Sequence, residues 1–160
     1  MDDKITIQQI RENPEIRTYI ERADISLKAM GYTEHSFAHV GIVSKVAGDM
    51  LRDLGHDEHT VELARIAGWM HDIGNVVNRS DHAQSGAIMA FRILDKMGMP
   101  AEDVAAIIAA IGNHDEATAW PVSAVSAALI IADKTDVRRS RVRNRNNTES
   151  FDIHDRVNYA

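Results

Sequence analysis

Segments with strong helix signals follow one another along most of this sequence. Asn13 and Pro14 predict the start of a helix, because asparagine is a favoured N-cap and proline fits the first turn. Gly31, Gly55 and Gly98 stand just beyond apolar stretches, where helices most often end. Aromatic residues make up only 5% of the chain and long apolar–polar alternation is absent, so strands are not expected. The sequence therefore predicts an all-α fold with about six main helices, near residues 14–30, 36–54, 57–72, 80–97, 100–111 and 122–137.

The length of 160 residues suits one domain. We expect residues 1–137 to form a helical bundle, and residues 138–160 to form a basic loop and C-terminal tail of the same domain. The stretch 122–137 is apolar on nearly all sides, which predicts a central helix. Ser80 is the expected N-cap of the fourth helix. The last segment, Phe151 to Ala160, could be a strand or a docked tail.

An arginine-rich segment follows the sixth predicted helix. Asparagines and other polar residues separate its arginines, which is typical of an exposed basic segment. Two interpretations stay open: a solvated loop, or a surface that holds phosphate groups, to which guanidinium groups form bidentate bonds. The arginines are Arg138, Arg139, Arg141, Arg143 and Arg145.

Composition limits the chemistry that this chain can perform. It has eight histidines and no cysteine, which excludes disulfides, thiolate zinc sites and a cysteine nucleophile. The net charge of −6 disfavours a stable nucleic-acid partner or a membrane surface. No apolar run approaches the roughly 20 residues of a membrane span, and the first residues do not resemble a signal peptide. We therefore expect a cytoplasmic protein whose transition-metal chemistry, if any, uses imidazole and carboxylate ligands.

Metal-capable side chains end or interrupt several of the predicted helices. His71 and Asp72 are adjacent at the end of the third helix, and His39 lies on the apolar face of the second. Asp133 interrupts an apolar stretch, where an unpaired carboxylate would be costly, so a metal or an arginine should meet it. His82 and His114 stand at the ends of the fourth and fifth helices, whereas His56, His59 and His154 are expected at the surface.

The ordered succession of these residues resembles the HD superfamily of metal-dependent phosphohydrolases. The resemblance extends from about Glu34 to Arg143 and includes His71-Asp72-Ile73-Gly74 and Ala132-Asp133. It implies a single HD-type helical domain that holds a divalent transition metal, with two ions where the extra histidines are present. Iron or manganese is expected, with zinc, nickel or cobalt as alternatives. The implied ligands are His39, His71, Asp72 and Asp133, with His82 and His114 as the extra pair, while His35 is a rival for the first position.

Two branches of the superfamily are close in layout. The symmetrical diadenosine tetraphosphatase branch is similar in its histidine-then-glycine pattern and in its acidic and arginine-containing ending. The HD-GYP cyclic-dinucleotide branch is similar in the His-Asp-Ile-Gly stretch, but Asn75 replaces its usual lysine and no Gly-Tyr-Pro follows His114. Asp115 and Glu116 stand there instead, which argues against hydrolysis of cyclic di-GMP. The short connection from His71 to His82 implies a narrow substrate mouth.

The resemblance implies an enzyme that cleaves a phosphoester or phosphoanhydride of a nucleotide or related phosphorylated small molecule. Asp72 is expected to bridge two ions and, with Lys134, to serve the reaction itself. Two other function classes stay open: an HD-type di-iron oxygenase, and a regulatory module that binds metal without turnover. A homo-oligomer is compatible with the sequence. The residues expected to contact substrate are His35, Lys134, Arg138, Arg139 and Arg141.

Overall fold

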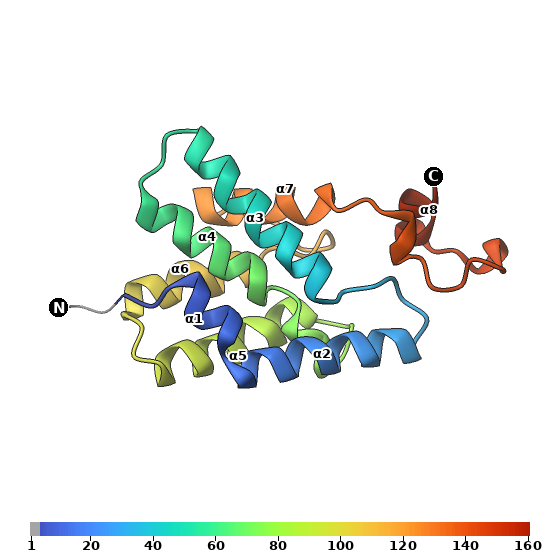
Figure 1. Cartoon of the computed structure of the whole chain (residues 1–160), viewed down its shortest axis with the longest axis horizontal. Coiled ribbons are helices and arrows are strands. Elements are labelled where there is room, and N and C mark those ends of the chain that lie inside the picture. The colour runs from blue at the N-terminus through green and yellow to red at the C-terminus, as the bar shows by residue number, and fades with distance from the viewer. Residues whose placement is uncertain (1–3) are drawn as a thin grey trace.

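A computed structural model describes residues 4–160 of the chain (Figure 1). Across these residues it contains α-helices and short 3-10 helices and no strand, which confirms the all-α prediction. None of these helices is long and apolar enough to cross a lipid bilayer. The α-helices are α1 (Ile7–Glu12), α2 (Pro14–Ala29), α3 (Phe37–Asp53), α4 (Glu58–Met70), α5 (His82–Lys96), α6 (Ala101–Gly112), α7 (Ala124–Thr135) and α8 (Ile153–Tyr159), and the 3-10 helices are η1 (Ile73–Val76), η2 (Arg139–Arg141) and η3 (Thr148–Ser150).

The helix ends follow the capping signals in most cases. The Asn13 side chain accepts hydrogen bonds from the first backbone amides of α2, as predicted. The prediction for α5 was wrong, because its N-cap is Asp81 rather than Ser80. Asp81 has a φ of 56° and makes no capping bond with its side chain. This left-handed residue turns the chain sharply before His82, so that the new helix starts directly at a histidine.

Two short helices were not predicted. Thr6 and Gln9 form a reciprocal capping box at the start of α1, and Asp152 and Asp155 do the same for α8. Both helices are too short to show a helical spacing of apolar residues, so only their capping residues could have predicted them. The C-terminal tail is therefore a short helix rather than a strand.

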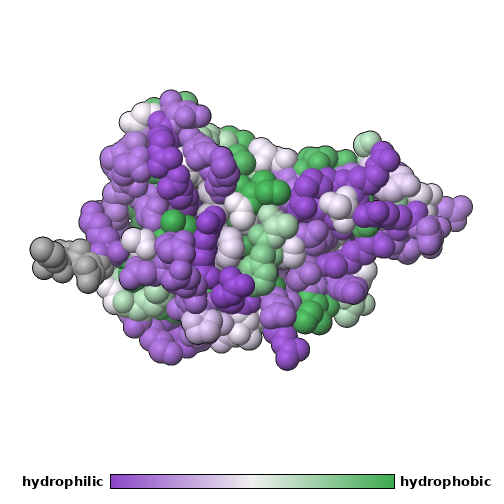
Figure 2. Space-filling view, viewed as in Figure 1, coloured by the Kyte–Doolittle hydropathy of each residue, from purple (hydrophilic) through white to green (hydrophobic). Residues whose placement is uncertain are grey.

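Helix α4 lies inside the bundle, and the site residues His71 and Asp72 directly follow its C-terminal end. It contacts α1, α3, α6 and α7, while α5 packs on α6 and on η1 (Figure 1). Helix α7 contacts α3, α4 and α6 but leaves Ile131 exposed, so α4 is buried over more of its length than the helix expected to be central. Figure 2 shows that the outer face in this view is largely hydrophilic, with scattered apolar patches.

Two close backbone approaches fix the elements around the site. A Cβ at Gly68 would lie 2.7 Å from the Cα of Ser44, so α3 and α4 cross in contact there. A Cβ at Gly74 would collide with the carbonyl oxygen of His82 and would lie 2.5 Å from the amide nitrogen of Gly86. The start of α5 can therefore sit against η1 only while residue 74 has no side chain.

The arginine-rich segment is only in part the exposed loop that its composition suggested, because Arg139 and Arg145 are exposed whereas Arg141 and Arg143 are not. Arg141 is buried, and its Nε donates a 2.9 Å hydrogen bond to the carbonyl oxygen of Glu34. Arg143 is half-buried and donates from Nε to the carbonyl oxygen of Tyr32 at 2.9 Å. These bonds tie the segment to the connection between α2 and α3, because long arginine side chains can satisfy backbone carbonyls that no helix uses.

We predict that Gly74→Ala destabilises the fold by about 3 kcal/mol or more, since the new methyl group must push η1 away from α5. Thermal and urea unfolding of the purified protein would measure the loss. Gly41→Ala is the matched control, because a Cβ there meets Trp69 at an ordinary 3.7 Å. An unchanged melting temperature for Gly74→Ala would contradict the close approach.

Candidate metal centre

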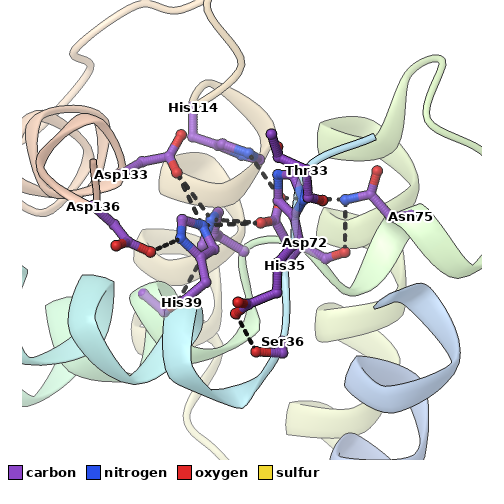
Figure 3. A network of polar contacts seen from close by, with 12 residues as sticks. Thr33, His35, Ser36, His39, Asp72, Asn75, His114, Asp133 and Asp136 are labelled. Atoms are coloured by element: carbon purple, nitrogen blue, oxygen red, sulfur yellow. Dashed lines mark hydrogen bonds and ion pairs between the residues drawn. The ribbon is translucent and has the colours of Figure 1, made fainter. Parts of the chain in front are cut away.

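Two histidines and two aspartates converge inside the bundle, and Figure 3 labels three of them, His39, Asp72 and Asp133. His39 comes from α3, His71 and Asp72 follow α4, and Asp133 comes from α7. His39 Nε2 lies 3.3 Å from Asp72 Oδ2 and 3.2 Å from Asp133 Oδ1. His71 Nε2 lies 3.0 Å and 3.4 Å from the same two oxygens. Four potential ligand atoms thus surround one point.

Three of these atoms lack any hydrogen bond. His39 Nε2, His71 Nε2 and Asp72 Oδ2 are inaccessible to solvent and have no partner with hydrogen-bond geometry. Leaving buried polar atoms unpaired costs free energy, so natural sites rarely contain several together. Imidazole nitrogen and carboxylate oxygen are donors that divalent transition metals accept, and the donor set therefore fits such an ion.

A second pair of histidines faces the other oxygen of Asp72. His82 Nε2 and His114 Nε2 are 3.2 Å apart, at 3.6 Å and 3.7 Å from Asp72 Oδ1. Asp72 therefore stands between two donor groups and offers one oxygen to each. The structure brings together all six of the residues predicted as metal ligands.

The other ring nitrogen of each histidine is already occupied. His71 Nδ1 donates to the carbonyl oxygen of Gly68 at 2.8 Å, three residues back along the chain. His82 and His114 make the same i to i−3 contact, with Arg79 at 3.0 Å and Ile111 at 2.6 Å. Because Nδ1 carries the proton in these bonds, Nε2 is left as the ligand atom.

His39 has an acidic partner in place of a carbonyl oxygen. Its Nδ1 donates to Asp136 Oδ2 at 2.8 Å. Asp136 is buried, and Arg138 and Arg141 lie on its carboxylate and carbonyl oxygens. Burial opposes the charge of Asp136, but the hydrogen bonds from Arg138 and His39 outweigh it and hold the pKa of this carboxyl well below its usual range. Asp136 was not among the predicted site residues, although it lies three positions after Asp133.

Without metal, the electrostatics of the cluster favour protonated imidazoles and ionised carboxylates. Burial lowers the pKa of His39, but the carboxylates close to its ring, first among them Asp133, raise it to about 9. Burial also opposes charge on His71, yet Asp72 and Asp133 raise its pKa to about 10. Burial raises the pKa of Asp72 and Asp133, and the neighbouring imidazoles outweigh it and hold both pKa values well below the usual range. Without metal, protons on the His39 and His71 imidazoles therefore supply the positive charge at this point, and a metal would displace them.

Asn75 and His35 complete the surroundings of Asp72. The Asn75 Nδ2 donates to the Asp72 carbonyl at 3.0 Å and to Oδ1 at 3.3 Å, a role that the sequence did not reveal. His35 is buried, and its Nδ1 donates to the carbonyl oxygen of Thr33 at 2.7 Å. Burial lowers the pKa of His35 well below its usual value, so it is neutral at pH 7. His35 can also reach a point shared with His39 and Asp72, so both rivals for the first position lie at the centre.

A cleft of about 290 Å³ opens onto the cluster. Lys134 and Arg141 line it, whereas Arg138 and Arg139 do not. Arg139 donates instead to the carbonyl oxygen of Tyr159 at 2.9 Å. Asp133 pairs with histidines, and its Oδ2 lies 3.4 Å from Lys134 Nζ. Its cationic neighbour is therefore a lysine and not the arginine that the sequence suggested. The cleft also contains residues that were not predicted as site residues: Arg79 and His154, the latter expected to be a surface histidine.

The family comparison agrees with this arrangement. Residues 36–143, which include all six predicted metal ligands, match the HD domain family. The chain belongs to the HD domain family. An uncharacterized protein of Methanocaldococcus jannaschii is 24% identical over 173 aligned positions, which cover 94% of this chain and 66% of that protein, so the chain spans just under two thirds of its relative's length. The crystal structure of a predicted HD superfamily hydrolase from an uncultured Thermotogales bacterium superposes with a TM-score of 0.60 and 26% identity, over 82% of this HD chain and 73% of the other.

We predict that Asp136→Asn weakens divalent-metal binding by about ten- to a hundredfold, because the amide no longer holds the His39 ring with a charged acceptor. Competition with a chromophoric chelator would measure the affinity. Asp95→Asn, on the exposed surface of α5, is the control and should bind metal as the wild type does. Equal affinities for both variants would contradict the role of Asp136.

Proposed function

We propose that this HD domain protein is a metal-dependent phosphohydrolase that acts on a nucleotide or a related phosphorylated small molecule. The observation that carries the proposal is the position of Asp72, whose two oxygens face two separate groups of imidazoles. Such a bridging carboxylate is what a two-metal hydrolytic site requires. The hydrolase name of the Thermotogales relative supports the same reaction class.

Two ions are proposed, each held by its own donor group. His39, His71 and Asp133 would hold one ion together with one oxygen of Asp72, and His82 and His114 the other with the second oxygen. Iron or manganese is proposed first, and zinc, nickel or cobalt suit the same ligands. When bound, such ions supply a hydroxide nucleophile near neutral pH and offset charge on phosphoryl oxygens.

Cationic side chains around the cleft are proposed to bind the phosphate group. Arg141 lines the cleft, and backbone carbonyl oxygens hold its Nε and Nη1 at 2.9 Å and 2.8 Å. A guanidinium fixed in this way loses little conformational entropy when it binds an anion. Arg79 lines the same cleft.

Lys134 and His35 are proposed to serve the reacting groups. Lys134 pairs with Glu116 and Asp133, and although burial opposes its charge, these carboxylates raise its pKa, so it stays cationic. It can offset negative charge that develops on the substrate. His35 is neutral and donates through Nδ1, so its Nε2 can accept a hydrogen bond from a hydroxyl group of the substrate. We propose a cytoplasmic location for the protein itself.

The test is phosphate release from a panel of phosphate esters. We predict that the wild type, loaded with Mn²⁺ or Fe²⁺, releases phosphate from at least one nucleotide. Asp72→Asn should lower kcat by about a thousandfold or more, because one substitution disturbs both donor groups. Asp53→Asn, an exposed aspartate at the end of α3, is the control.

Two results would contradict the proposal. One is an Asp72→Asn protein that releases phosphate as fast as the wild type. The other is iron-dependent oxygen consumption by the wild type without phosphate release from any ester, which would identify an oxygenase instead.

A further inference from the structure

Helix α8 supplies one wall of the cleft that opens onto the His/Asp cluster. Ile153, His154, Val157 and Asn158 line this cleft together with Asp72, although they lie far away in sequence. After the arginine-rich segment, the chain returns to the cleft at this helix. A substrate whose phosphate reached the cluster would therefore place its remaining atoms next to α8.

Polar contacts hold α8 in this position. On the side of η2, the backbone amide of Arg138 donates to Asn158 Oδ1 at 2.9 Å. Arg139 donates to the last carbonyl oxygens of the helix, and its guanidinium stacks over the Tyr159 ring at 4.9 Å. Across the mouth, His154 Nε2 lies 2.8 Å from Glu116 Oε1, on the loop that follows α6. The helix is anchored on both sides, which gives a fixed wall.

Two of the four α8 residues that line the cleft are apolar, whereas nearly all of its other lining residues are acidic, basic or histidine. Ile153 is 67% exposed and Val157 is 48% exposed, and Val137 beside them is 51% exposed. Apolar side chains left open to water next to polar groups are typical of ligand sites, where the polar groups orient the ligand and the apolar groups contact its body. The part of a ligand that meets these residues should itself have an apolar face.

We infer that Ile153 and Val157 determine specificity by contacting the apolar face of the substrate's leaving group. The inference rests on the proposed phosphohydrolase function and names its substrate class: a phosphate monoester whose leaving group carries a flat apolar ring, of the size of one nucleoside. A cleft of about 290 Å³ is at the lower end of the range for ligand sites, which favours one nucleoside unit over two.

The test compares two ligands that share the phosphate and the sugar but differ in the apolar ring. Binding of AMP and of ribose 5-phosphate to the Mn²⁺-loaded protein is measured by calorimetry. We expect the wild type to bind AMP about tenfold more tightly. The double variant Ile153→Ser/Val157→Ser should lose that preference, while its affinity for ribose 5-phosphate changes by less than about twofold.

Ile88→Ser is the matched control, because Ile88 is 68% exposed on α5 and does not line the cleft. It should keep the preference for AMP. The inference is overturned if the wild type shows no preference, if the double variant keeps it, or if Ile88→Ser loses it too. A double variant that binds AMP normally but sediments differently would assign the apolar face to a second copy of the chain.

Because the measurement needs no turnover, its failure is distinct from that of the proposed function. A protein that prefers AMP through Ile153 and Val157 but releases no phosphate would support the wall and contradict the hydrolase. Phosphate release from esters, together with an unchanged preference for AMP in the double variant, would support the hydrolase and contradict the wall.

Discussion

The carboxylate of Asp72 is buried among imidazoles, and the rest of the centre is arranged around it. No hydrogen bond satisfies its Oδ2, and His39 and His71 point unpaired nitrogens toward the same place. Such an arrangement is costly for a fold unless a cation occupies it. The bundle nevertheless uses its well-packed elements to build it, since α3 and α7 each contribute a ligand and His71 and Asp72 directly follow α4. The centre is therefore a site for a cation and not a packing feature.

Helix ends position the ligands. The backbone carbonyl groups near a helix C-terminus lack intrahelical partners, and histidines at these ends can use them. His71 and His114 each bind the carbonyl group three residues earlier, which directs Nε2 to the centre. His82 reaches the same centre from the first turn of α5, and this requires the contact of that turn with Gly74. The geometry of the second donor group thus depends on a glycine that supplies no ligand itself.

The fold and the principal cluster could be predicted because their signals are local or ordered. The caps and apolar faces of α2 to α7 lie within each segment, and the histidines and aspartates stand out against apolar surroundings. The supporting residues gave no such signal. Asp136, Asn75 and His154 are ordinary polar residues in sequence, and only the folded chain places them against His39, Asp72 and Glu116. Likewise, nothing local distinguishes Arg141, which faces the cleft, from Arg139, which anchors α8.

The most direct test of the account is the metal content of the purified protein and of two variants, measured by elemental mass spectrometry after reconstitution. The account predicts about two ions per chain in the wild type and about one in His82→Ala/His114→Ala, because that variant removes the second donor group and spares the first. Asp72→Asn should retain less than about one ion, since Asp72 faces both groups. A double-histidine variant that still holds as much metal as the wild type would contradict the account, as would an Asp72→Asn protein with full occupancy.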